Sequence, residues 1–196
     1  SAGDDVRRGQ LLFEDKKMPG VRYTAPAAGK VSAVNRGERR AFQSLVIELT
    51  DEERSGRSGG PEEAGFAAFA DKHPASMTAD EVRDLLVESG LWTALRARPF
   101  SRVASPEDRP HSIFVTATDT NPLAPDMDVV VGGREADLER GLAALSKLTD
   151  GAVFFCTSAE SSIKAPAVDR LRHERFAGPH PAGTAGLHIH KLDPVG

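Results

Sequence analysis

The larger part of this chain is organised around one run of residues, Ser112-Ile113-Phe114-Val115-Thr116-Ala117. The run is apolar and rich in β-branched side chains, which predicts a buried strand. A second run of the same kind is Gly151-Ala152-Val153-Phe154-Phe155-Cys156. Between the two runs, residues 134–148 carry leucines at helical spacing, namely Leu138, Leu142, Leu145 and Leu148. Strands that alternate with helices indicate a parallel α/β sheet.

The segment between the first strand and the leucine helix, residues 118–133, is rich in Pro and Gly and is predicted to be a loop. Upstream of the strand, Thr78-Ala79-Asp80-Glu81 forms a capping box, which predicts the start of a helix. Val82, Leu85 and Leu86 continue that helix as one apolar stripe. Gly90 is the expected left-handed residue at its end.

The first part of the chain has a different pattern, in which short β-forming runs alternate with Gly- and Pro-rich turns. Many short, closely spaced strands predict a small barrel or sandwich. We therefore predict an all-β domain at residues 1–50, a charged and Gly/Ser-rich mobile linker at 51–61, and an α/β domain at 62–196.

Composition excludes several classes of function. The chain has 196 residues, of which 39% are hydrophobic and 28% charged, and a formal net charge of −4. A weakly acidic balance argues against nucleic acid as a partner. The single cysteine, Cys156, excludes an internal disulfide framework and a multi-cysteine metal site, and its place at the end of an apolar strand predicts a buried thiol rather than a nucleophile. No run approaches the roughly 20 apolar residues of a membrane-spanning helix.

Several longer motifs resemble one family. They are Gly9-Gln10-Leu11-Leu12-Phe13-Glu14-Asp15-Lys16-Lys17, Glu88-Ser89-Gly90-Leu91-Trp92-Thr93-Ala94-Leu95-Arg96, Asp119-Thr120-Asn121-Pro122-Leu123-Ala124 and Gly178-Pro179-His180-Pro181-Ala182-Gly183. Together they are similar to the A subunit of the bacterial sodium-translocating NADH:quinone reductases (Nqr), and the resemblance extends over most of the chain.

That resemblance implies a fold and a setting. The fold is a barrel-sandwich-hybrid domain of the biotinyl/lipoyl type, followed by a Rossmann-like α/β domain related to the flavin- and NADH-handling subunit of complex I. The family protein is longer, beginning upstream of Ser1 and continuing beyond Gly196. It lies peripherally on the cytoplasmic face of the bacterial inner membrane, contacting the membrane only through the other members of a six-subunit complex. The complex couples NADH oxidation and quinone reduction to Na⁺ export.

The resemblance also implies where the redox chemistry resides. Flavins and iron centres belong to partner subunits, the family is associated with quinone handling, and ubiquinone is a candidate ligand of the complex. We therefore expect a structural, quinone-associated piece that binds no cofactor of its own and is not catalytic in isolation. An electron-transfer module of the related Rnf type is an alternative interpretation of the same motifs.

A biotin or lipoyl carrier is a second alternative, because such carriers present a lysine at the tip of a β-hairpin. Lys16 and Lys17 lie near such a tip, but Met18-Pro19-Gly20 lengthens the turn and displaces them from the usual register. We favour a solvated basic turn on a shared scaffold.

A dinucleotide site is a third alternative. Such a site needs a Gly-rich strand-to-helix turn whose backbone amides hold pyrophosphate. Residues 118–122 contain no glycine, Asp119 would repel phosphate and Pro122 removes an amide donor. Gly132-Gly133 before the leucine helix is weak evidence.

Residues 178–190 gather histidines in a Pro/Gly-rich segment. His188 and His190 would share one face if the segment were a strand, and His173, His180, Glu174 and Asp193 lie nearby in sequence. We predict no physiological metal there and favour a rigid turn. The candidates for contact with a quinone or a partner are His180, His188, His190, Asp119 and Asn121, although for Asp119 and Asn121 we favour the capping of a turn.

Overall fold

The structure is a computed structural model that describes residues 1–57 and 59–195. The chain divides into two compact units, which we describe separately. We call them the β unit and the α/β unit. The β unit comprises Ser1–Ala70, Asp84–Ala97 and Val103–Pro106, and the α/β unit comprises Asp71–Arg83, Arg98–Arg102 and Glu107–Gly196.

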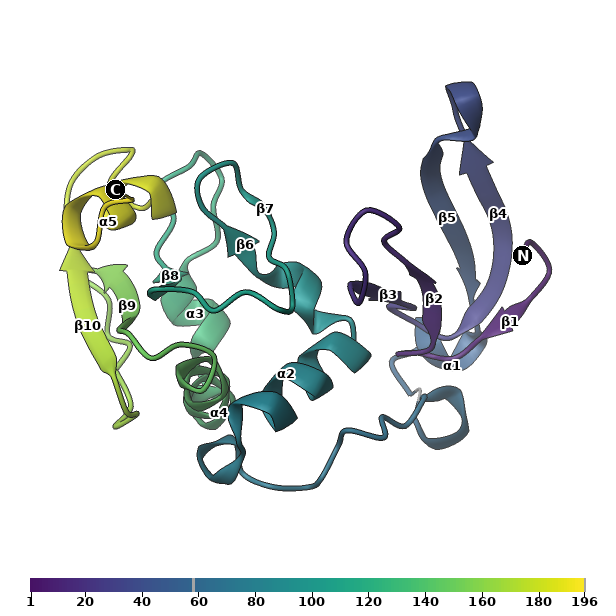
Figure 1. The fold of residues 1–196 in the computed structure, drawn as a ribbon, viewed down its shortest axis with the longest axis horizontal. Coiled ribbons are helices and arrows are strands. Elements are labelled where there is room, and N and C mark those ends of the chain that lie inside the picture. The colour runs from purple at the N-terminus through teal and green to yellow at the C-terminus, as the bar shows by residue number, and fades with distance from the viewer. Residues whose placement is uncertain (58, 196) are drawn as a thin grey trace. The chain divides into compact units, whose positions relative to one another are not determined.

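The β unit is built from strands, as predicted, and the structure shows that they pair in antiparallel fashion (Figure 1). The strands are β1 (Asp5–Val6), β2 (Leu11–Glu14), β3 (Arg22–Thr24), β4 (Gly29–Arg36) and β5 (Phe42–Leu49). One sheet has the order β1-β4-β5, and β2 and β3 form a separate hairpin. Val6, Ala25 and Val31 are the buried centre of this unit. Gly29 is required where β4 meets β5, because a Cβ there would lie 2.1 Å from the Glu48 carbonyl oxygen.

Residues predicted to be a mobile linker begin instead with a turn of helix, α1 (Asp51–Arg54). Thr50 caps this helix, since its hydroxyl accepts a hydrogen bond from the Glu53 amide at 3.1 Å. The described residues also form short 3₁₀ helices, namely η1 (Glu38–Arg40), η2 (Gly60–Glu62), η3 (Pro74–Ser76) and η4 (Leu91–Ala94). The linker prediction was therefore wrong for α1, where capping outweighs the flexible composition.

The α/β unit contains a parallel sheet, as predicted (Figure 1). Its strands are β8 (Ile113–Ala117), β9 (Val153–Ser158) and β10 (Leu171–Phe176), in the order β10-β9-β8. Helix α4 (Glu135–Ser146) supplies Leu142, which is buried with Val153 and Phe155 in the core. The predicted leucine helix and both predicted strands are confirmed.

The predicted capping box is also present. Helix α2 (Ala79–Glu88) begins after Thr78, whose hydroxyl accepts from the Glu81 amide at 3.2 Å while the Thr78 amide donates to the Glu81 carboxylate at 2.8 Å. Gly90 has a φ of 79°, the left-handed conformation expected at a helix end. Two short strands follow, β6 (Arg96–Ala97) and β7 (Arg102–Val103).

Three elements differ from the sequence prediction. Helix α3 (Met127–Val131) lies inside the predicted loop, and strand β10 was not predicted. Helix α5 (Ala185–Leu192) occupies the second part of the segment 178–190, for which we favoured a rigid turn and considered a strand as the condition for a metal site. The turn prediction was wrong for these residues, and the strand is excluded as well, so His188 and His190 point to different sides of a helix. Tertiary contacts hold α5, including the Phe176 and His188 rings, whose centroids lie 4.0 Å apart.

None of the helices in the described part of the chain has both the length and the apolar composition that are needed to cross a membrane.

Candidate functional site

The bend after β8 is the first part of the candidate site. Asp119 Oδ1 accepts hydrogen bonds from the Asn121 backbone amide at 2.9 Å and from the Asn121 side-chain amide at 2.7 Å. The carboxylate therefore caps the turn, as the sequence favoured. Because the Asn121 amide is already used and Pro122 has none, the bend does not offer the row of free amides that a phosphate needs.

Thr120 joins this bend to the segment after β10. The Thr120 hydroxyl accepts from the Gly183 amide at 3.0 Å and lies 3.2 Å from His180 Nδ1. Gly183 permits this approach, since a Cβ there would lie 2.5 Å from the Thr120 amide nitrogen. The structure thus brings His180 to the Asp119–Asn121 turn, at the carboxyl end of the sheet where ligands of open α/β folds bind.

His188 points into the unit instead of lining a surface. Its side chain is fully buried, and its Nε2 lies 2.8 Å from the Ala182 carbonyl oxygen. Burial lowers the pKa of His188, because it disfavours the charged form of the ring. Within the described part of the chain, its buried Nδ1 has no hydrogen-bond partner.

Two further histidines, His190 and His173, have surroundings that differ from those of His180 and His188. His190 is exposed on α5, and His173 Nε2 lies 2.8 Å from the Thr157 hydroxyl oxygen, next to the Phe155 ring. Burial and the nearby charge of Arg175 lower the pKa of His173. Within residues 1–57 and 59–195, no group of three His, Cys, Asp or Glu side chains is placed to hold a metal ion.

A carboxylate that the sequence did not single out connects α3 to the loop after β9. Asp128 accepts from the Ser161 hydroxyl, from the Ser162 amide at 2.7 Å and from the Ser162 hydroxyl at 2.9 Å. The hydrogen bond from Ser161, with those from Ser162, lowers the pKa of Asp128. Its partners lie more than thirty residues away, so no local pattern marks the contact.

Cys156 is fully buried in β9, as predicted. Burial, with the nearby Glu174 carboxylate, raises the pKa of the thiol to about 12. The side chain therefore stays a thiol near neutral pH and is no nucleophile.

The β unit has an apolar cavity of about 330 Å³ that the sequence did not reveal. Three aromatic rings gather at it, because Phe13 stacks on Tyr23 with centroids 4.8 Å apart and meets Phe42 at 4.9 Å. Leu45 and Ile47 of β5 also line the cavity. Stacked rings and aliphatic walls suit a flat, mostly apolar ligand.

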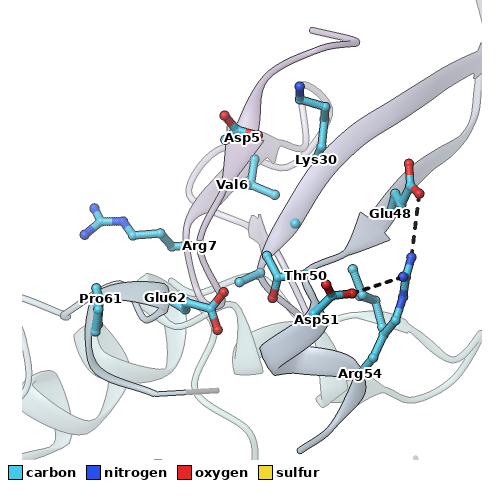
Figure 2. Close-up of a pocket in the computed structure, with 13 residues that line it drawn as sticks. Asp5, Val6, Arg7, Lys30, Glu48, Thr50, Asp51, Arg54, Pro61 and Glu62 are labelled. Carbon is cyan, nitrogen blue, oxygen red and sulfur yellow. Dashed lines mark hydrogen bonds and ion pairs between the residues drawn. The ribbon is translucent and has the colours of Figure 1, made fainter. Parts of the chain in front are cut away.

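A second cavity of the β unit, of about 540 Å³, is lined by side chains of both charges (Figure 2). Arg54 reaches Glu48 at 3.6 Å and Asp51 at 3.5 Å, which pairs part of that charge internally. Lys30, Arg7 and Glu62 complete a mixed lining.

Lys16 and Lys17 are exposed in the turn between β2 and β3. The Lys17 amide donates to Asp15 Oδ1 at 2.8 Å, which shapes the turn locally. The structure thus places both lysines at a hairpin tip, and the prediction that neither is modified stays a prediction.

Comparison with known proteins adds the family context. Residues 1–50 match the family model described as the NqrA N-terminal barrel-sandwich hybrid domain, and residues 77–196 match the NqrA second alpha/beta domain. The A subunit of the Na(+)-translocating NADH-quinone reductase of Saccharophagus degradans is 50% identical over 98% of this chain and 41% of its own length. The proteins of the same name from Pseudomonas aeruginosa UCBPP-PA14 and Neisseria meningitidis serogroup B are 50% and 45% identical, each over 99% of this chain and 41% of their own length. The chain thus spans about two fifths of these relatives.

Proposed function

The chain belongs to the NqrA family, the A subunits of Na⁺-translocating NADH-quinone reductases, and on that premise we propose that the full-length protein works as such a subunit. We propose further that it is peripheral and cytoplasmic-side, and that it supports quinone reduction while partner subunits carry the flavins and iron centres. The complex would couple NADH oxidation and quinone reduction to Na⁺ export.

One observation carries the proposal of a supporting rather than an electron-transferring role. The bend after β8, where an α/β fold of this kind would hold a nucleotide, uses Asp119 and Asn121 to cap itself. The hydrogen bond from the Gly183 amide to the Thr120 hydroxyl then fixes a second loop against it. Both features favour a rigid docking surface over a cofactor cradle.

For the quinone, the geometry favours the aromatic cavity of the β unit. A quinone ring is flat and largely apolar, and the stacked Phe13 and Tyr23 rings offer a matching surface. The histidine candidates suit it less well, because His188 is buried, His190 is exposed and only His180 adjoins the Asp119–Asn121 turn. We place His180 at the docking surface and the quinone ring at Phe13 and Tyr23.

The docking role is tested in bacteria whose own gene for this protein is replaced by variants. Thr120→Val combined with His180→Ala removes the polar link between the two loops, and His190→Ala is the exposed histidine control. The complex is purified through a tag on one of its other members. We expect the double variant to lower the amount of this protein that co-purifies, and the control to leave it unchanged. Wild-type recovery of the double variant would refute the role of this surface.

The quinone role needs a separate readout. In the assembled complex, Phe13→Ala should raise the KM for quinone. The rate of NADH oxidation with a soluble artificial electron acceptor should stay the same. Phe69→Ala is the control, because Phe69 is 61% exposed and does not line the cavity. An unchanged KM for quinone would exclude this cavity as the quinone site, and the docking proposal would be unaffected.

A further inference from the structure

The turn between β4 and β5 gathers positive charge in a chain that is acidic overall. Residues 36–40 contain three arginines, Arg36, Arg39 and Arg40, and one glutamate, Glu38, which gives the turn a formal net charge of +2. The whole chain has a formal net charge of −4. All of these charged residues are exposed. We call residues 36–40 the arginine tip.

The arginine tip projects from the β unit. Strand β1 pairs with Gly29 and Lys30 at the start of β4, whereas β4 and β5 stay paired as far as Arg36 and Phe42. Figure 1 shows this end of the hairpin extending beyond the other strands of the unit. Sites for small molecules are concave, and a projecting turn has no walls to enclose one. The tip therefore suits the surface of another macromolecule.

The backbone of the tip has an unusual conformation. Arg39 and Arg40 have φ values of 53° and 60°, in the left-handed region that glycine, asparagine and aspartate favour. Residues with long side chains are strained there, and glycine would adopt the same turn without that strain. The two arginines therefore stand where they lower stability. Strain of this kind clusters at functional sites.

Hydrogen bonds fix the shape of the tip. The Gly37 amide donates to the Ala41 carbonyl at 2.8 Å, and the Arg40 amide donates to the Gly37 carbonyl at 3.1 Å. Arg36 Nη1 donates to the Arg40 carbonyl oxygen at 3.1 Å. The turn is thus formed before any partner arrives, which reduces the entropy that binding costs.

The charges of Arg39 and Arg40 are available to a partner. Ion pairs within the described residues involve other arginines, such as Arg8, Arg22 and Arg54, but neither of these two. A guanidinium binds a carboxylate through two parallel hydrogen bonds, and arginine is enriched at the energetic centres of protein interfaces. Two guanidiniums on a fixed turn therefore match carboxylates whose positions are also fixed.

This fixed geometry favours a folded protein over a membrane as the partner. An anionic membrane surface attracts basic segments by their charge and does not need them to be held in one conformation. A strained and hydrogen-bonded turn adds nothing to such an attraction. It does add to the recognition of acidic side chains, because bidentate pairs depend on orientation.

We propose that the arginine tip docks on an acidic surface of another protein of the complex, where Arg39 and Arg40 bind carboxylates. This inference rests on the proposed function, in which the full-length protein is a subunit. It adds a contact made by the β unit to the one that we assign to Thr120 and His180 in the α/β unit.

Co-purification of the full-length protein with the tagged complex tests this contact. In bacteria that carry only the variant gene, Arg39→Glu with Arg40→Glu should lower recovery about tenfold, because the reversed charges repel carboxylates. The matched control is Lys16→Glu with Lys17→Glu, which reverses two exposed charges at the turn between β2 and β3 and should keep wild-type recovery. Equal recovery of the two double variants would overturn the proposal.

Glycine variants separate the contact from folding. Arg39→Gly with Arg40→Gly removes both guanidiniums and relieves the backbone strain. We expect the urea midpoint of this variant to equal or exceed that of the wild type, while its recovery with the complex falls. Wild-type recovery would contradict the proposal. A recovery that fell together with a lowered urea midpoint would also contradict it, because the arginines would then serve folding.

Two further results identify the partner and check the premise. Vesicles of phosphatidylglycerol and phosphatidylcholine that bind the wild-type full-length protein but not the glycine variant, with unchanged co-purification, would assign the tip to a membrane and overturn the proposal. Failure of the wild type itself to co-purify would overturn the proposed function and this inference with it. Wild-type recovery of the tip variants would overturn this inference alone.

Discussion

At the scale of single residues, the carboxylate of Glu53 organises one end of the β unit. Its side chain is 6% exposed and binds Arg8 through two nitrogens, at 2.6 and 3.0 Å, and the Ala28 amide at 2.7 Å. Glu53→Ala would leave that amide unsatisfied, which costs about 2 kcal/mol. We expect urea unfolding to show this loss of stability. The exposed neighbour Glu52 is the control. An equal loss of stability in Glu52→Ala would show that the buried contacts of Glu53 do not stabilise the protein.

The buried imidazole of His188 predicts a pH dependence of stability. Burial lowers its pKa in the folded protein, so the folded state binds fewer protons than the unfolded state, where the pKa is about 6.5. The stability that His188 contributes is present above that value and is lost as the pH falls below it, toward the lower folded pKa. His173 adds to the same trend, because its pKa is also lowered.

The contribution of His188 can be isolated by His188→Gln, which removes the titration but keeps an amide donor for the Ala182 carbonyl. Between pH 7.5 and pH 5, we expect the urea midpoint of this variant to fall less steeply than that of the wild type. His190→Gln changes an exposed histidine on the same helix and should keep the wild-type slope. A wild-type slope for His188→Gln would remove His188 from the pH dependence.

At the scale of secondary-structure elements, the capping box before α2 is a stabilising contact with a purely local origin. Thr78→Ala removes the hydroxyl that accepts from the Glu81 amide and should destabilise the protein by about 1 kcal/mol. Thr78→Ser keeps the hydroxyl and should stay close to wild type. Thermal unfolding of both variants measures the difference, and equal melting temperatures would show that the cap is dispensable.

Local signals also explain which elements were predictable. Thr78 and Gly90 mark the start and the end of helix α2, and the spacing of the leucines marks helix α4. Both helices were therefore predicted from the sequence. Strand β10 was missed because a strand at the edge of a sheet carries charges, and those charges hide its β pattern. Helix α5 was missed because the prolines and glycines of residues 178–186 favoured a rigid turn, whereas the packing of Phe176 on His188 is a tertiary contact.

In the candidate site too, the contacts between neighbouring residues were predicted from the sequence, and the contacts between distant segments were not. The capping role of Asp119 is local, since its partner is Asn121, and the sequence favoured it. The link from Thr120 to His180 and Gly183 spans about sixty residues, and the aromatic cavity joins β2, β3 and β5. Contacts between distant segments leave no periodic trace in a sequence, so only the structure reveals them.

At the scale of the whole molecule, the chain combines a barrel-sandwich hybrid domain with an α/β domain. A shared scaffold does not carry the function of its relatives, which depends on the residues at the site. In the β unit, the relevant residues are Lys16 and Lys17, and unmodified intact mass is the expected result for both. A mass increase equal to a biotinyl or lipoyl group would make this unit a carrier domain.

The α/β unit makes the corresponding prediction for nucleotides. Binding of NADH or FMN at the carboxyl end of β8 would need free backbone amides near phosphate, yet Asp119 takes the Asn121 amide and places a negative charge there. We expect isothermal titration of this chain with NADH or FMN to show no binding in the micromolar range. Asp119→Ala should not create binding, because Pro122 still lacks an amide and the bend still lacks glycine. Micromolar binding by the wild type would mean that the unit holds a cofactor and takes part in electron transfer directly.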